Sequence, residues 1–136
     1  MAYWLFKEDP EHYSFAKLER DGRTVWDGVA NNLALQYLRQ VAKGDRVLCY
    51  HSGQEKAIVG VMEVVKGPRP DPSEKDERLV VVDVKALRRW QRPVTLAQIK
   101  ADAAFAEWEL VRNSRLSVMP VKPELWRRLE ELSKRG

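Results

Sequence analysis

The feature that most limits the possible folds is a pair of β-rich runs in the middle of the chain, RVLCYHS at residues 46–52 and AIVGVMEVVK at residues 57–66. Branched aliphatic and aromatic residues dominate both runs, and a short polar loop around Gly53 joins them, which is typical of a β-hairpin. A third run, LVVVDVKALRR at residues 79–89, contains no glycine or proline and predicts a long strand. Hairpin-linked strands favour an antiparallel sheet over a doubly wound parallel one.

Shorter elements flank this sheet. AYWLFK at residues 2–7 predicts a strand, and SRLSVMPV at residues 114–121 predicts another with a bend. The charged, proline-rich segment 67–78 is predicted to be a surface loop. Helices are predicted from an apolar stripe or a capping pattern at five places: after Ser14, after Asn31 or Asn32, after Thr95 with Gln98 three residues on, over 103–110, and from Pro123.

Together these elements predict an α+β fold, a mixed β-barrel or curled sheet of about five to six strands with peripheral helices. A chain of 136 residues suits one domain over residues 1–136. No stretch of about 18 apolar residues that could span a membrane occurs, and the first twenty residues hold seven charged ones and no signal core. The single cysteine cannot form an internal disulfide. We therefore expect a cytoplasmic protein, favour a monomer, and predict no membrane partner and no cofactor.

The net charge of +4 lies entirely in the second half of the chain. Residues 1–68 hold nine basic and nine acidic side chains, whereas residues 69–136 hold fifteen and eleven. Because arginine binds phosphate through a planar two-pronged contact, this half is a candidate surface for a polyanion, the alternative being an ordinary solvated face. Its basic points include Arg88, Arg89, Arg92, Arg112, Arg115, Arg127 and Arg128.

Cys49 and His51 are the candidates for catalysis. Two residues apart on a predicted strand, they project from the same face, which is the minimum for a thiolate–imidazole pair. Residues at that spacing lie about 6–7 Å apart, so the side chains would have to lean together. No nucleophile-elbow, zinc-protease or phosphate-loop motif occurs. We interpret Cys49 as a small core residue, and a metal site that includes His12 has no supporting spacing.

A different set of residues suits a flat, ring-shaped ligand. The motif WDGV at residues 26–29 places an indole on a predicted turn, where Trp26 can form one wall of a nucleobase pocket and Tyr50 offers a second π face. Gly28 leaves room for a ligand to approach the backbone. The alternative readings are a core role for Trp26 and an ordinary turn at Asp27 and Gly28. The remaining candidates are base-edge partners Asp27, Asn31 and Ser52, and phosphate partners Lys7 and Arg115.

At these residues the sequence resembles the EVE domain family of the PUA-like superfamily, to which YTH and ASCH domains are related. The resemblance rests on YWLFK, YSF, WDGV with Asn31, GDRVLCYHS, IVGVMEVV, RLSVMPV and a tryptophan in the last predicted helix, in that order across residues 2–132. It implies a PUA-like fold and a role in binding, in which a modified base of DNA or RNA enters an aromatic pocket. The pocket residues that it implies are Lys7, Trp26, Gly28, Val29, Asn31, Tyr50, His51, Ser52, Arg115, Leu116 and Ser117.

The chain departs from the family pattern near this pocket. Glu8 and Asp9 stand where family members commonly have Ser-Glu, and Ala30 stands where they commonly have arginine. Asn32 and Leu35 replace a common aromatic residue and a second arginine. Three functions remain as hypotheses: a non-enzymatic reader of a modified base, a small-molecule or nucleotide sensor or hydrolase that uses the same cleft, and a module whose cleft binds a peptide.

Overall fold

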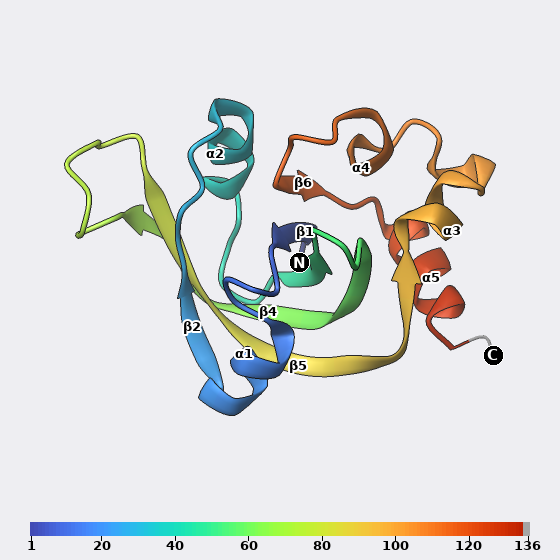
Figure 1. The fold of residues 1–136 in the computed structure, drawn as a ribbon. Helices are drawn as coiled ribbons and strands as arrows, with labels where there is room; N and C mark the ends of the chain where they lie inside the picture. Colours follow the sequence, from blue (N-terminus) through green and yellow to red (C-terminus); the bar gives the residue numbers. More distant parts are fainter. Residues whose placement is uncertain (135–136) are drawn as a thin grey trace.

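A curled six-stranded sheet forms the centre of the computed structural model, which describes residues 1–134 (Figure 1). The strands lie side by side in the order β2–β5–β4–β3–β1–β6. Their bounds are β1 (Tyr3–Glu8), β2 (Arg23–Trp26), β3 (Arg46–His51), β4 (Ala57–Pro70), β5 (Val80–Thr95) and β6 (Val118–Pro120). The sheet is not closed, since β2 and β6 remain at its two edges, and the expected α+β curled sheet is confirmed.

The pairing of the central strands is the one that the sequence predicts, with β3, β4 and β5 antiparallel to each other. The first strand adds a feature that the sequence did not indicate, because β1 lies parallel to β3. Parallel neighbours need a long crossover, and the chain from β1 to β3 supplies it by passing through α1, β2 and α2. The curl brings β1 against β2 although three strands separate them, with the rings of Phe6 and Trp26 5.5 Å apart.

Several predicted boundaries were wrong. The strand expected over 79–89 continues as β5 to Thr95. The loop expected at 67–78 is shorter, because β4 continues to Pro70 and absorbs Gly67 and Pro68 through shifts of register. The strand expected over 114–121 is confined to β6, because the preceding residues form a turn in which Leu116 N–H donates to Asn113 O at 3.2 Å. Prolines and charges indicated the loop and alternating side chains indicated the strand at 114–121, whereas neighbouring strands decide how far each segment can pair.

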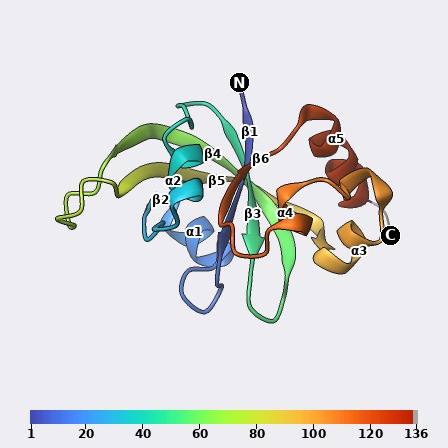
Figure 2. The same cartoon turned by 90° about the horizontal axis from the view of Figure 1, so that it is seen from above.

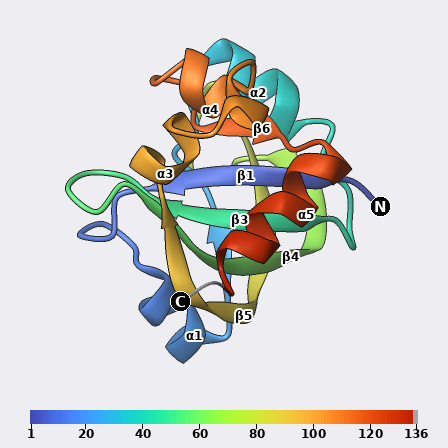
Figure 3. The ribbon, with the colours of Figure 1, turned by 90° about the vertical axis from the view of Figure 1, so that its right-hand side faces the viewer.

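Helices cover both sides of the sheet, α1 and α2 on one side of the β1–β3 pair and α3, α4 and α5 on the other (Figure 2). Figure 3 shows α5 lying across β1 and β3. The predicted N-caps at Ser14 and Asn31 are confirmed, as is the capping box of Thr95 with Gln98. The elements are α1 (Phe15–Asp21), α2 (Asn32–Leu38), α3 (Leu96–Lys100), the 3-10 helix η1 (Ala103–Phe105), α4 (Glu109–Arg112) and α5 (Pro123–Leu132). No helix within residues 1–134 is long and apolar enough to cross a membrane.

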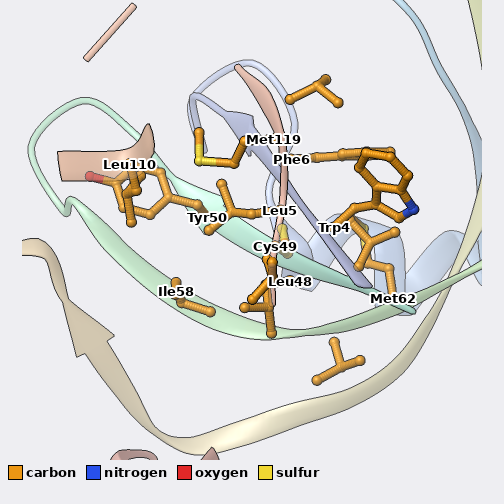
Figure 4. Packing of buried hydrophobic residues seen from close by; sticks show 14 of the residues in the cluster. Trp4, Leu5, Phe6, Leu48, Cys49, Tyr50, Ile58, Met62, Leu110 and Met119 are labelled. Atoms are coloured by element: carbon orange, nitrogen blue, oxygen red, sulfur yellow. The ribbon is translucent and has the colours of Figure 1, made fainter. Parts of the chain in front are cut away.

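The two faces of β1 pack against different parts of the core. Trp4 and Phe6 lie on one side of β1, whereas Leu5 lies on the other, on the side of Tyr50 from β3 and Met119 (Figure 4). This alternation follows from the pleat of a β-strand.

Helix α1 approaches the sheet closely at Gly60. A Cβ atom at Gly60 would lie 2.3 Å from Cε1 of Phe15, so only glycine fits there. This close contact fixes the position of the chain segment that leads into α1.

Candidate functional site

A cavity of about 250 Å³ opens where the end of β1, the start of α1 and the end of β2 meet. It lies on the face of β1 that carries Phe6, since Phe6 contacts Trp26 and Trp26 lines the cavity. Its walls are formed by Glu8, His12, Tyr13, Lys17, Thr24, Val25, Trp26 and Asp27. Two of the twelve predicted ligand-binding residues, Trp26 and Asp27, are therefore brought together here.

Trp26 reaches this cavity from the last position of β2, where it pairs with Val82. The side chain is more buried than the open wall that we expected, at 5% exposed, because Phe6 packs against it. Its indole N–H makes no hydrogen bond to another residue within 1–134, and it is not among the fully buried unpaired polar atoms of that range. Trp26 thus lines the cavity with little exposed surface, and its indole N–H has no partner within residues 1–134.

Tyr13 supplies the second aromatic ring of the cavity. Its hydroxyl donates to Asp21 Oδ2 at 2.9 Å, and the ammonium group of Lys17 lies 5.4 Å from the ring centroid. Burial raises the pKa of Tyr13, and the hydrogen bond to Asp21 adds to this effect, so the phenol stays neutral at physiological pH. A half-buried, uncharged ring of this kind can support a planar ligand.

Carboxylates form the polar side of the cavity. Glu8 follows Phe6 by two residues on β1, so both project from the same face. Its side chain is 21% exposed, and its Oε1 atom accepts from the Asp9 N–H at 2.9 Å and lies 3.2 Å from His12 Nδ1. Asp27 is exposed at the rim. With Lys17 as the only lysine or arginine among the lining residues, the walls carry an excess of negative charge when His12 is neutral.

His51 does not line the cavity but contacts the start of α1. The side chain is 6% exposed, and its Nε2 atom accepts the backbone N–H of Phe15 at 3.0 Å. Because Nε2 accepts, the ring proton is on Nδ1, which lies 2.7 Å from Glu55 Oε1. His51 therefore ties the first residue of α1 to β3.

Lys7 and Tyr50 lie on the opposite face of the strand pair, so the structure does not place them in the Trp26 cavity. They are register partners on β1 and β3, and Lys7 Nζ lies 5.5 Å from the Tyr50 ring centroid. Lys7 also donates from Nζ to Ser114 O at 3.1 Å and from its backbone N–H to Ser117 O at 2.9 Å. Burial lowers the pKa of Lys7 and raises that of Tyr50.

Each of the remaining predicted residues has a defined contact, backbone conformation or degree of exposure in the fold. Asn31 Oδ1 accepts the Ala34 N–H at 3.0 Å as the cap of α2, and Ser52 N–H donates to Glu8 O at 2.9 Å. Gly28 has a φ of +77°, a left-handed conformation that suits glycine after the Trp26 strand. The three others differ in exposure: Val29 and Leu116 are buried, and Arg115 is exposed.

The surroundings of Cys49 disfavour the thiolate form that a nucleophile needs. The thiol is 2% exposed, and burial raises its pKa to about 12, with the negative charges of Glu8 and Glu55 adding to the effect. A register shift in the pairing with β4 follows directly after Cys49. Within residues 1–134, no group of three or more His, Cys, Asp or Glu side chains is arranged to hold a metal ion.

A larger cavity of about 550 Å³ lies on the other side of the molecule, between α4, β6 and α5. None of the twelve predicted residues lines it. Its apolar surface comes from Trp108, Pro120 and Leu125, and Trp108 donates from its indole to Pro120 O at 3.0 Å. We therefore regard the smaller cavity, where the sequence motifs converge, as the candidate site.

The basic half of the chain is less available to a polyanion than its charge indicates. Four of the seven predicted arginines pair with carboxylates: Arg88 with Glu130, Arg89 with Glu19, Arg112 with Glu107, and Arg128 with Asp102. In the described part of the chain, no ion pair forms at Arg92, Arg115 or Arg127. These three are the arginines of the set that remain free for phosphate.

Sequence reasoning missed most of the cavity wall. The lining residues that were not among the predicted site residues are Glu8, His12, Tyr13, Lys17, Thr24 and Val25. Tyr13 belongs to the YSF motif, which was a signal for its role. The proximity of β1 and β2 was not readable, because it depends on the curl of a sheet in which three strands separate them.

Residues 2–132 match the sequence model of the EVE domain. Human thymocyte nuclear protein 1 is 29% identical over 157 residues, which cover 90% of this chain and 70% of that protein. The NMR structure of Rpa0253 from Rhodopseudomonas palustris is 37% identical with a TM-score of 0.92, covering 98% of this chain and 93% of that one. The crystal structure of human THYN1 in complex with 5-methylcytosine-containing DNA is 27% identical and has a TM-score of 0.92. The match covers 100% of this chain and 99% of that one. These likenesses confirm the PUA-like fold, and the chain belongs to the EVE domain family.

Proposed function

We propose that this protein binds nucleic acid that carries a modified base and holds that base, extruded from its strand, in the cavity beside Trp26. The observation that carries the proposal is its likeness to human THYN1, a protein whose structure contains 5-methylcytosine DNA, over the whole of this chain with a TM-score of 0.92. DNA is our first choice of nucleic acid for this reason. The role is one of binding, and the proposal assigns no catalytic step.

The size of the cavity suits one heterocyclic ring. At about 250 Å³ it falls just below the range of roughly 300–1,000 Å³ that pockets for drug-sized ligands occupy. A whole nucleotide would have to leave its sugar and phosphate outside, where solvent hydrates them. The cavity is thus matched to a base that has left its stack.

The free-energy cost of extruding a base is close to the free energy gained when the cavity binds it. Extrusion of a base costs a few kcal/mol, and less when the base is already unpaired. Stacking against an aromatic ring contributes about 1–3 kcal/mol, and each hydrogen bond about 1 kcal/mol. Tyr13 and Trp26 are the aromatic residues that line the cavity. We therefore expect modest affinity that is higher for single-stranded than for duplex oligonucleotides.

The test is fluorescence anisotropy at low salt with labelled oligonucleotides that carry one central 5-methylcytosine or one central abasic site. Trp26→Phe shortens the cavity wall and removes the free N–H, so we expect binding of the 5-methylcytosine strand to weaken by about three- to tenfold. Trp90→Phe is the matched control, since Trp90 is 4% exposed, buries an unpaired indole N–H and does not line this cavity.

The proposal requires the wild-type protein to prefer the 5-methylcytosine strand to the abasic strand, and Trp26→Phe to erode that preference. Equal binding of both strands by wild type would contradict it. A loss of the same size in Trp90→Phe would show that the change acts through the fold and not through the cavity.

A further inference from the structure

We infer that Glu8 makes the cavity selective for a base with an exocyclic amine, such as cytosine and its 5-substituted forms, and against keto bases such as thymine and uracil. The inference rests on the proposed function and names the chemical class of base that the site accepts. It depends on the contacts of one carboxylate in the cavity wall.

Glu8 is held as a fixed hydrogen-bond acceptor. Its Oε1 atom is engaged by the Asp9 N–H at 2.9 Å and approaches His12 Nδ1 at 3.2 Å. Its Oε2 atom makes no hydrogen bond to another residue within 1–134. One oxygen therefore orients the group and the other is available to a ligand.

The low exposure of Glu8 makes its free oxygen selective for an occupant that donates a hydrogen bond. The side chain is 21% exposed, so an occupant that covers it removes its remaining water. A carboxylate that loses water and gains no donor is costly, whereas a charged acceptor that gains an amine N–H forms a strong hydrogen bond. Asp27 also lines the cavity, but it is exposed at the rim and stays hydrated, so it contributes less.

Two bases of the same shape separate this effect from packing. 5-Methylcytosine and thymine carry the same methyl group at C5, but 5-methylcytosine has an N4 amine donor where thymine has the O4 acceptor. Against Glu8, the first forms a hydrogen bond and the second brings two acceptors together. A cavity that recognised only the methyl group and the ring would bind both equally.

The experiment compares short single strands that differ only in one central base: 5-methylcytosine, thymine or an abasic site. We expect wild type to bind the 5-methylcytosine strand about ten- to a hundredfold more tightly than the thymine strand. In Glu8→Gln the amide can rotate to donate to O4, so binding of the thymine strand should improve and the ratio should fall to within about threefold. Glu11→Gln is the matched control, because Glu11 lies three residues after Glu8 in the turn that follows β1, is exposed and does not line the cavity.

The outcomes separate this inference from the proposed function. If wild type binds both methylated bases equally, above the abasic strand, and Trp26→Phe weakens both, the selectivity of Glu8 is overturned and the base-binding cavity stands. If wild type prefers neither base to the abasic site, the cavity itself is refuted and the selectivity falls with it. A ratio unchanged by Glu8→Gln assigns the discrimination to another group and likewise overturns the inference.

Discussion

The two faces of the β1–β3 strand pair differ in the groups that their side chains contact. On one face, Phe6 and Glu8 lead from a packed core to a cavity with carboxylates and two aromatic rings. On the other, Lys7 and Tyr50 contact each other, and the ammonium group of Lys7 is also hydrogen-bonded to Ser114 O. On the first face the Oε2 atom of Glu8 has no partner among the described residues, whereas on the second the ammonium group of Lys7 already donates to a backbone carbonyl.

This difference shows that two residues next to each other in the sequence of a motif can lie on different faces and in different sites. Lys7 and Glu8 are adjacent in the sequence, yet the pleat sends their side chains to opposite faces. We propose that the face of Glu8 recognises the base. Contact with the phosphate backbone requires exposed cations, and Arg115 is the free one on the loop beside Lys7.

The largest expected effect comes from removing the anchor of the cavity wall. Phe15→Ala should lower the free energy of unfolding by about 3–5 kcal/mol, because Phe15 is fully buried and fills the space above Gly60. Denaturant unfolding measures this loss. The matched variant Phe105→Ala, on the opposite side of the sheet, should cost a similar amount. Only Phe15→Ala should also weaken binding of the 5-methylcytosine strand beyond what the loss of folded protein accounts for, and equal binding by both variants would remove α1 from the site.

A smaller effect is expected at the clamp that holds β2, the strand that carries Trp26. Asp83 accepts from Arg23 and Arg69 at 2.7 Å each, and although burial acts to raise the pKa of Asp83, these arginines lower it overall. A lowered folded-state pKa stabilises the protein above the unfolded pKa, and this contribution is lost as the pH falls through the folded value.

Asp83→Asn should therefore cost about 1–3 kcal/mol at neutral pH. The difference from wild type should shrink as the pH falls below about 4, where the carboxyl of the unfolded chain becomes protonated. Denaturant unfolding at a series of pH values checks the sign. A difference that grows on acidification would show that the clamp does not act through its charge.

The face of Lys7 should contribute affinity without discrimination. Arg115→Ala should weaken binding to the 5-methylcytosine and thymine strands by the same factor and reduce the slope of log affinity against log salt by about 0.7–1. Arg112→Ala is the control, since Arg112 is already paired with Glu107 at 2.6 Å. A change in the ratio of the two affinities in Arg115→Ala would place the two faces in one site after all.

The smallest expected effect is on the reactivity of Cys49, which lies opposite Phe6 in the strand register. With a pKa of about 12, only about one thiol in ten thousand is ionised at pH 8. Iodoacetamide should therefore leave the native protein unmodified under conditions that alkylate it in denaturant, as mass spectrometry would report. Rapid alkylation of the native protein would revive the hydrolase hypothesis.

Much of the scaffold was readable from local signals. The hairpin of β3 and β4 and the caps at Ser14, Asn31 and Thr95 depend on neighbouring residues only, and the structure contains them. The parallel pairing of β1 with β3 was not readable, since it depends on the path of a long crossover.

The candidate site was readable only in part, for the same reason. Trp26 and Asp27 line the cavity as neighbours in one motif. Tyr50 was grouped with Trp26 because both offer a flat π face, but the register places Tyr50 beside Lys7 and so on the other face. Which face a strand residue occupies is known relative to its neighbours on the strand, whereas the identity of that face is set by the curl of the whole sheet.

The most direct test of the central claim uses the five tryptophans as probes of position. Nitrogen-15 spectra of the indole N–H groups, assigned through single Trp→Phe variants, would be recorded during titration with the 5-methylcytosine strand. We predict that the Trp26 signal shifts most and that the Trp108 signal, from the larger cavity, stays in place. A shift at Trp108 with no change at Trp26 would contradict the assignment of the base to the cavity between β1, α1 and β2.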